Sequence, residues 1–251
     1  MNESNPNSPV PPVIPSIARK PGDDPAEQVP IQNGIAAVEA ILRQPRRVMY
    51  QLRQPGAGKL IAAMLFIAVV CSVVYGVVAG TFTGGTQLWA APVKIASGLM
   101  ISALICLPSL YIFTCLSGSQ ARLAEVFGLL AGLLALMTIL LVGFAPVAWI
   151  FSQSTESIVW MGMLHLVFWL IATLFGLRFL KTGFAHSQAR SQAGINTWII
   201  IFLLVALQMT AALRPIIGKA DSFLPAEKKF FISHWVDCVF HSQDSKPKSG
   251  V

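Results

Sequence analysis

Long apolar runs alternate with short polar gaps along most of the chain. Five apolar runs stand out, with approximate limits at residues 60–80, 95–116, 123–145, 158–180 and 195–213. A helix of about 20 residues rises about 30 Å, which matches the hydrocarbon thickness of a bilayer. Because a helix satisfies its own backbone hydrogen bonds in lipid, the pattern predicts an all-α, polytopic transmembrane helical bundle of about five spans over residues 59–214.

Residues 1–33 have no such pattern and are rich in Pro, Asn, Ser and Asp. Prolines recur throughout this segment, at Pro6, Pro9, Pro11, Pro12, Pro15, Pro21, Pro25 and Pro30. Proline lacks a backbone N–H and interrupts helices, and a segment of low hydrophobicity cannot bury enough apolar surface to fold. The sequence therefore predicts a disordered proline-rich tail.

Residues 34–58 are predicted to form a basic amphipathic interfacial helix, interrupted at Pro45. Apolar side chains recur at helical spacing, at Ile35, Val38, Ile41, Leu42, Val48, Met49 and Leu52. The basic side chains Arg43, Arg46, Arg47 and Arg53 occupy much of the rest. Such a helix is typical of the headgroup layer, with its apolar face inserted and its arginines on anionic lipid. The alternative is that it packs on loops of the bundle itself.

Residues 215–251 are predicted to form an aromatic and basic interfacial segment and tail. Arg214 ends the fifth apolar run, where its long side chain can reach the phosphate layer. Pro215 then stops the helix. Aromatic side chains, among them Trp235, alternate with lysines from residue 223 to residue 240. This mixture is typical of a segment at headgroup level.

Composition and charge agree with a membrane protein. The 251 residues are 55% hydrophobic and only 12% charged, and the net charge is +7. The basic residues flank the spans and form no basic domain with interleaved aromatics, so lipid headgroups explain them and a nucleic-acid partner is not expected. Lys and Arg are more frequent in the segments that would be inside if the N-terminus is cytoplasmic. The sequence therefore predicts an integral membrane protein with the N-terminus cytoplasmic and the C-terminus outside.

Candidate chemistry within the spans is sparse. His165 is the ionisable residue near the middle of a span, and Gln208 is the other strongly polar one. The chain has no Gly-x-Ser-x-Gly elbow, and no intramembrane carboxylate is available to orient the histidine. His234, Cys238 and His241 share helical spacing but fall short of a complete zinc site. We therefore expect no catalytic, cofactor-binding or metal-binding residues, and we expect His165 and Gln208 to form interhelical hydrogen bonds.

Small residues recur every fourth position in two of the spans. The two sets are Ser72, Gly76 and Gly80, and Ala124, Gly128 and Gly132. Such spacing lets helix backbones approach closely. It predicts tight packing within the bundle and does not require a dimer, although self-association stays open.

Several stretches resemble the Yip1 family of five-span membrane proteins and its bacterial relatives. They are residues 40–52 before the first span, residues 108–118, residues 144–151, and the closing residues 208–209 and 213–218 with Phe230 and Phe231. The resemblance implies a cytoplasmic N-terminal region, five spans and a non-enzymatic role as an adaptor or organiser of membrane or of a membrane complex. Through the bacterial relatives it also implies the bacterial inner membrane. In eukaryotes the family is associated with trafficking and with small lipidated GTPases, but no segment here matches a GTPase-contacting motif.

Two other functions stay open at this point. A small-molecule or lipid carrier would use the kinks at Pro108 and Pro146 and line a pathway with His165 and Gln208. An intramembrane enzyme would depend on His165. The carrier requires that the two polar side chains face a shared cavity.

Overall fold

The structure is a computed structural model that describes residues 24–82, 85, 87–119, 121–155, 158–185 and 193–212. The regular structure of these residues is helical throughout. The helices are α1 (Pro25–Gln28), α2 (Gly34–Arg43), α3 (Pro45–Leu52), α4 (Gly58–Thr81), α5 (Gln87–Leu116), α6 (Leu123–Ser154), α7 (Ile158–Ala185) and α8 (Ala193–Ala212). The predicted all-α class is confirmed.

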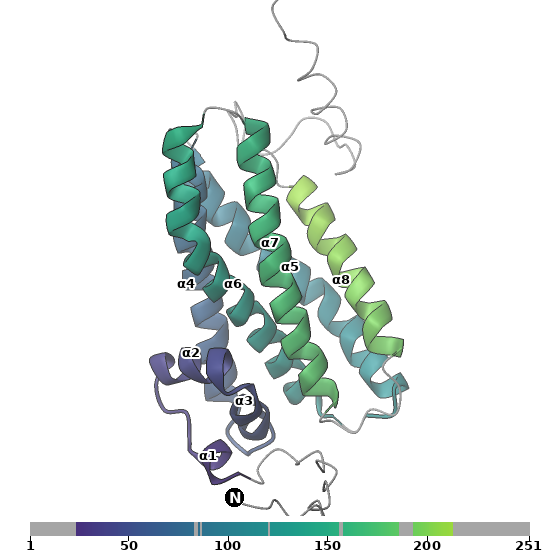
Figure 1. The fold of residues 1–251 in the computed structure, drawn as a ribbon. Coiled ribbons are helices and arrows are strands. Elements are labelled where there is room, and N and C mark those ends of the chain that lie inside the picture. The colour runs from purple at the N-terminus through teal and green to yellow at the C-terminus, as the bar shows by residue number, and fades with distance from the viewer. Residues whose placement is uncertain are drawn as a thin grey trace, which may run out of the picture.

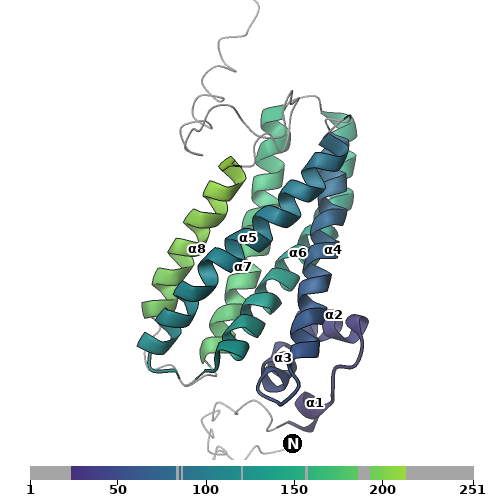
Figure 2. The same ribbon diagram turned by 180° about the vertical axis from the view of Figure 1, so that it is seen from behind.

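Helices α4 to α8 lie side by side and alternate in direction, while α1, α2 and α3 gather at one end of them (Figures 1 and 2). Helix α4 packs between α5 and α6, α6 also contacts α7, and α5 also contacts α8. The end of α8 therefore lies at the opposite end of the bundle from α1–α3.

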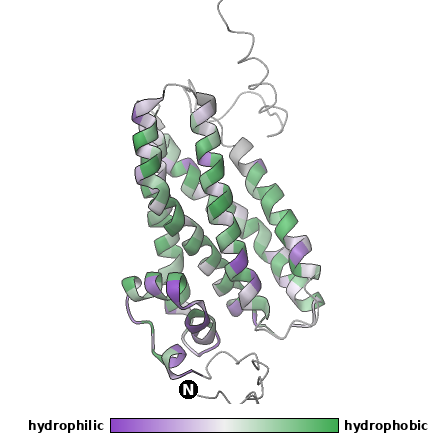
Figure 3. Ribbon diagram, viewed as in Figure 1, coloured by the Kyte–Doolittle hydropathy of each residue, from purple (hydrophilic) through white to green (hydrophobic). Residues whose placement is uncertain are grey.

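Within the described part of the chain, four helices are long and apolar enough to cross a membrane. They are α4, α6, and the stretches Leu88–Leu116 of α5 and Trp160–Ala185 of α7. Helix α8 adds a shorter apolar stretch, Ala193–Gln208. Hydrophobic residues predominate along these helices (Figure 3), and large apolar side chains are exposed on them, with Phe66 of α4 at 70%. Apolar surface of this extent is not left in water, so the chain is an integral membrane protein.

Helix α6 forms the centre of the packing. Nearly every side chain from Val126 to Thr138 is buried, which is the pattern of a helix with neighbours on all sides. The predicted small-residue positions carry its contacts, because a methyl group on Gly132 would lie 2.6 Å from the Phe179 ring of α7. Gly128 meets Leu52 of α3 in the same way. These glycines pack within the bundle, as predicted.

Helix α4 crosses α5 closely at Gly76. A methyl group added at Gly76 would lie 2.9 Å from the backbone nitrogen of Pro92 and closer still to its Cα. Pro92 lies inside α5, where it removes one backbone hydrogen bond. Membrane helices tolerate such prolines because neighbouring groups satisfy the freed carbonyl.

Several predicted span limits need correction. Helix α5 starts at Gln87 instead of residue 95, and α6 and α7 continue to Ser154 and Ala185. The apolar pattern is interrupted by Lys94 at the start of α5, and by polar side chains at the ends of α6 and α7. A helix does not end where hydropathy falls, because its backbone hydrogen bonds continue into the headgroup layer.

The N-terminal limits need correction too. Residues 24–33, predicted as part of the tail, are structured: the Asp24 side chain accepts a 3.0 Å hydrogen bond from the backbone N–H of Ala26 and caps α1, with Pro25 in the first turn. The segment predicted as a helix interrupted at Pro45 forms the two helices α2 and α3, because a helical conformation is disfavoured for the residue before a proline. Helix α3 ends at Leu52, and Gly56, at a φ of 96°, turns the chain into α4.

Residues 1–23 and 213–251 lie outside the described residues. They include most of the predicted tail and the whole predicted interfacial segment, with Arg214 and Trp235.

Candidate functional site at the membrane interface

Residues 24–52, which we call the collar, form a cap on one end of the bundle (Figure 1). The inner face of the collar is buried and belongs to the same apolar core as the spans. Its buried side chains are Ala37, Ala40, Ile41, Val48, Met49 and Leu52. Most of the apolar face that was predicted to enter the membrane therefore packs on the protein. It packs on helices of the bundle, whereas the alternative prediction had it on loops.

Arg47 fastens the start of the collar to α3. Its Nε donates to the Val29 carbonyl at 2.8 Å, and one terminal nitrogen donates to the Pro30 carbonyl at 3.1 Å. Gln51 accepts a 3.0 Å hydrogen bond from the backbone N–H of Ile31 and donates to the Val29 carbonyl. Because three of its nitrogens donate to oxygens of the protein, Arg47 is a structural clamp, and its predicted contact with the membrane or a partner stays a prediction.

The substitution Arg47→Ala should release residues 24–31 from α3 while the spans stay folded. Hydrogen bonds from a charged donor contribute about 1.5–3 kcal/mol, and the partial exposure of Arg47 lowers that figure. We expect faster amide hydrogen exchange at residues 29–31, measured by mass spectrometry. Arg43→Ala is the matched control and should leave those amides unchanged.

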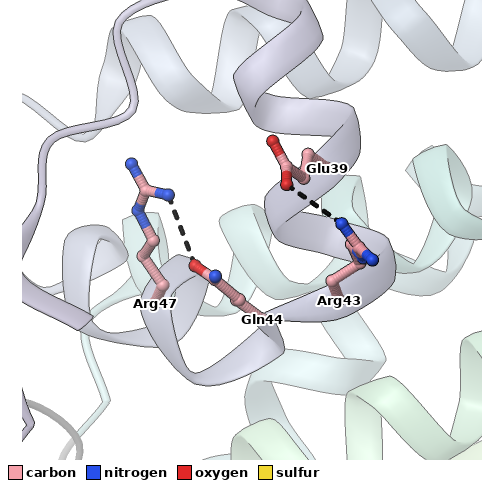
Figure 4. A network of polar contacts seen from close by, with 4 residues as sticks. All are labelled: Glu39, Arg43, Gln44 and Arg47. Carbon is pink, nitrogen blue, oxygen red and sulfur yellow. Dashed lines mark hydrogen bonds and ion pairs between the residues drawn. The ribbon is translucent and has the colours of Figure 1, made fainter. Parts of the chain in front are cut away.

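The remaining predicted arginines point outward or pair locally. Arg43 contacts Glu39 at 3.5 Å across one helical turn, and both side chains are exposed (Figure 4). Arg46 pairs with Glu27 of α1 at 3.8 Å. Arg53 is exposed in the turn that precedes α4. An exposed pair such as Arg43 and Glu39 contributes about 0–1 kcal/mol, so Arg43 can bind a partner at little expense to the fold.

Basic side chains concentrate at the collar end of the bundle. Among the described residues this end holds Arg43, Arg46, Arg47, Arg53, Lys59, Arg122, Arg178 and Lys181, whereas Lys94 lies toward the other end. Exposed tryptophans mark that other end, at Trp89, Trp149 and Trp160. Along α7, Arg178 follows Trp160 by 18 residues, a rise of about 27 Å at 1.5 Å per residue. This separation agrees with the roughly 30 Å hydrocarbon core.

His165 lies buried between helices and pairs with a tyrosine. The hydroxyl oxygen of Tyr75 on α4 lies 2.5 Å from Nδ1 of His165 on α7, and the two rings meet edge to face. Only 5% of His165 is exposed, and its Nε2 has no hydrogen-bond partner among the described residues. This pair therefore links α4 to α7, two helices whose backbones make little direct contact. No carboxylate among the described residues is hydrogen-bonded to this histidine.

Gln208 does not share a site with His165. Gln208 is exposed on α8, and α8 packs on α5, whereas His165 is enclosed between α7 and α4. The structure therefore does not bring together the two polar side chains that a shared pathway requires.

Sequence reasoning missed Lys94 and Tyr75. Lys94 was assigned to the polar gap before the second span, but it lies in the second turn of α5 with 1% of its surface exposed. A buried lysine within a membrane helix is costly and marks a position of interest. Extending the predicted helix through Pro92 would have placed it there. For Tyr75 no local signal exists, because its partner is 90 residues away.

Trp198 anchors α8 to α5. Its indole nitrogen donates a 3.0 Å hydrogen bond to the Cys106 carbonyl, and its ring stacks on Phe202. Gly194 allows the start of α8 to lie close to the Phe113 carbonyl of α5. This buried hydrogen bond therefore helps to set the position of α8 along α5.

Trp198→Phe should weaken this attachment by about 1 kcal/mol, because one buried hydrogen bond is lost while most of the apolar ring is kept. We expect a lower thermal midpoint in mild detergent and easier proteolysis near α8. The exposed Trp160 provides the control, since Trp160→Phe should change neither quantity.

Comparison of the chain with protein-family models, with curated proteins and with solved structures gives no match.

Proposed function

We propose that this chain is a non-enzymatic, Yip1-like adaptor or organiser of the membrane or of a membrane complex. One observation carries the proposal: the collar is packed into the core of the bundle while Arg43 on the collar and Arg53 directly after it remain exposed. A surface of this kind suits recognition of an acidic partner, because no folding is needed on binding. The partner is a protein, and anionic lipid headgroups surround the same basic end.

The basic end faces the cytoplasm in this proposal, and the membrane is the bacterial inner membrane. The support is the excess of Lys and Arg at the collar end among the described residues, which is the bias that cytoplasmic ends carry. With α8 as a fifth span, the C-terminus lies outside. The tryptophans at the far end then occupy the outer headgroup layer.

Purification of the tagged protein from its native membrane, with mass spectrometry of co-eluting proteins, tests the adaptor role. We expect a stoichiometric protein partner that is lost from the double variant Arg43→Glu, Arg53→Glu. The double variant Arg43→Lys, Arg53→Lys keeps the charge and should retain it. Arg47 is left unchanged because it holds the collar together. A lone protein, or a partner retained by the glutamate variant, would contradict the proposal.

A carrier of small molecules or lipids is the second candidate, and the unpaired Nε2 of His165 favours it. A ligand with a hydrogen-bonding group could satisfy this atom, with Tyr75 beside it. Gln208 plays no part, since it lies on another surface. A tightly bound small molecule that co-purifies and is lost on His165→Leu would support this candidate. An intramembrane enzyme is the third and weakest, and it requires an activity abolished by His165→Ala.

A further inference from the structure

Helix α2 has two separate apolar faces. Ala37, Ala40 and Ile41 are buried against the bundle. Ile35 and Leu42 lie on another face and are 85% and 46% exposed, with the half-buried Val38 between them. Since each residue turns a helix by about 100°, spacings of three and four residues place these three side chains in one stripe. We call Ile35, Val38 and Leu42 the outer stripe.

The third face of α2 is polar. Glu39 and Arg43 lie one turn apart, between the outer stripe and the buried face, and they pair at 3.5 Å (Figure 4). A helix on the surface of a soluble domain needs one apolar face and leaves the rest polar. Three faces, directed at protein, at apolar surroundings and at water, are typical of a helix that lies at a membrane boundary.

The position of α2 agrees with such a boundary. Helix α2 packs on α4 and α6, and it lies across the collar end of the bundle beside the first turns of α4 (Figures 1 and 2). Lys59 is exposed in the first turn of α4, and the lipid-facing Phe66 follows two turns later. The outer stripe is therefore close to the level where the apolar surface of the spans begins.

We propose that the outer stripe of α2 contacts the acyl chains of the phospholipid bilayer, with Arg43 at the level of the lipid phosphates. The inference follows from the packing of α2 on α4, which exposes apolar side chains from Phe66 onward, and from the basic charge beside the stripe. It rests on the membrane placement of the bundle but not on the adaptor role. Of the two apolar faces of α2, only the outer stripe would then enter the membrane, whereas the sequence predicted that the whole apolar face enters it.

Spin-label accessibility in nanodiscs of phosphatidylethanolamine and phosphatidylglycerol tests the inference. The full chain carries a single introduced cysteine, at Ile35→Cys, Leu42→Cys or Glu39→Cys, after its native cysteines are replaced by alanine. Phe66→Cys serves as the lipid-facing reference. Because each label is measured on folded protein, gel filtration of every variant is checked first.

Labels at 35 and 42 should collide several-fold more often with oxygen, relative to a water-soluble nickel complex, than the label at 39, and should approach the label at 66. A high nickel rate at 35 and 42 would place the stripe in water and overturn the inference. Immobile labels that meet neither reagent would show a protein cover, whether a second copy, another chain or residues outside the described part, and would overturn it too. Neither result would contradict the adaptor role, which the glutamate variants test separately.

Discussion

Gly76→Ala should destabilise the bundle more than any other single methyl group added to it. The new Cβ would lie 2.9 Å from the backbone nitrogen of Pro92 and closer to its Cα, and a proline backbone within a helix cannot move aside as a side chain can. Helices α4 and α5 must separate locally, and overpacking of this kind costs about 1–3 kcal/mol. The better helix propensity of alanine offsets at most about 1 kcal/mol of that loss.

The thermal midpoint in mild detergent, followed by fluorescence-detected gel filtration, measures this effect. Gly162→Ala is the matched control, because Gly162 is also helical and nothing lies within 4 Å of its added methyl group. That variant should be neutral or slightly more stable. Equal midpoints for the two variants would contradict the close α4–α5 crossing.

Tyr75→Phe should have the next largest effect. The substitution removes the hydroxyl that pairs with Nδ1 of His165 and leaves a buried imidazole with neither nitrogen bonded among the described residues. An unsatisfied buried polar group costs about 1–3 kcal/mol. His165→Leu should also destabilise, because the Tyr75 hydroxyl then loses its partner.

The double variant Tyr75→Phe, His165→Leu distinguishes a hydrogen-bonded pair from simple packing. Replacing both partners by apolar groups can be nearly neutral, so the double variant should be more stable than the sum of the two single effects. Strict additivity of the three thermal midpoints would show that the pair is not coupled. The same variants also test the carrier candidate, because the small molecule that co-purifies with each variant can be measured.

The spans could be predicted from the sequence because the bilayer imposes a simple physical rule. Only a long apolar helix satisfies its backbone in lipid, so the runs near residues 60–80 and 123–145 locate α4 and α6 directly. The ends of the helices follow no such rule. The chain stays helical through Pro92 and Lys94, where hydropathy falls. A helix is held by its backbone hydrogen bonds, so the hydropathy of the side chains does not mark its end.

The role of each arginine could not be predicted, because it depends on contacts distant in sequence. Arg43 and Arg47 are close in the sequence and carry the same charge. Arg43 is nevertheless exposed, whereas Arg47 donates hydrogen bonds to the carbonyls of Val29 and Pro30. The periodicity of the collar likewise predicts an apolar face but not what covers it. The Tyr75–His165 pair is also a tertiary contact and has no local signature.

The central claim is that the bundle crosses the membrane with its collar in the cytoplasm. The direct measurement is labelling of single cysteines by a membrane-impermeant thiol reagent, in a chain whose native cysteines are replaced by alanine. Glu39→Cys reports on the collar, and Gln153→Cys reports on the exposed far end of α6. In intact spheroplasts the cysteine at 153 should react and the one at 39 should not, and inverted vesicles should give the reverse. Reaction of both positions from the same side, or the opposite pattern, would contradict the account.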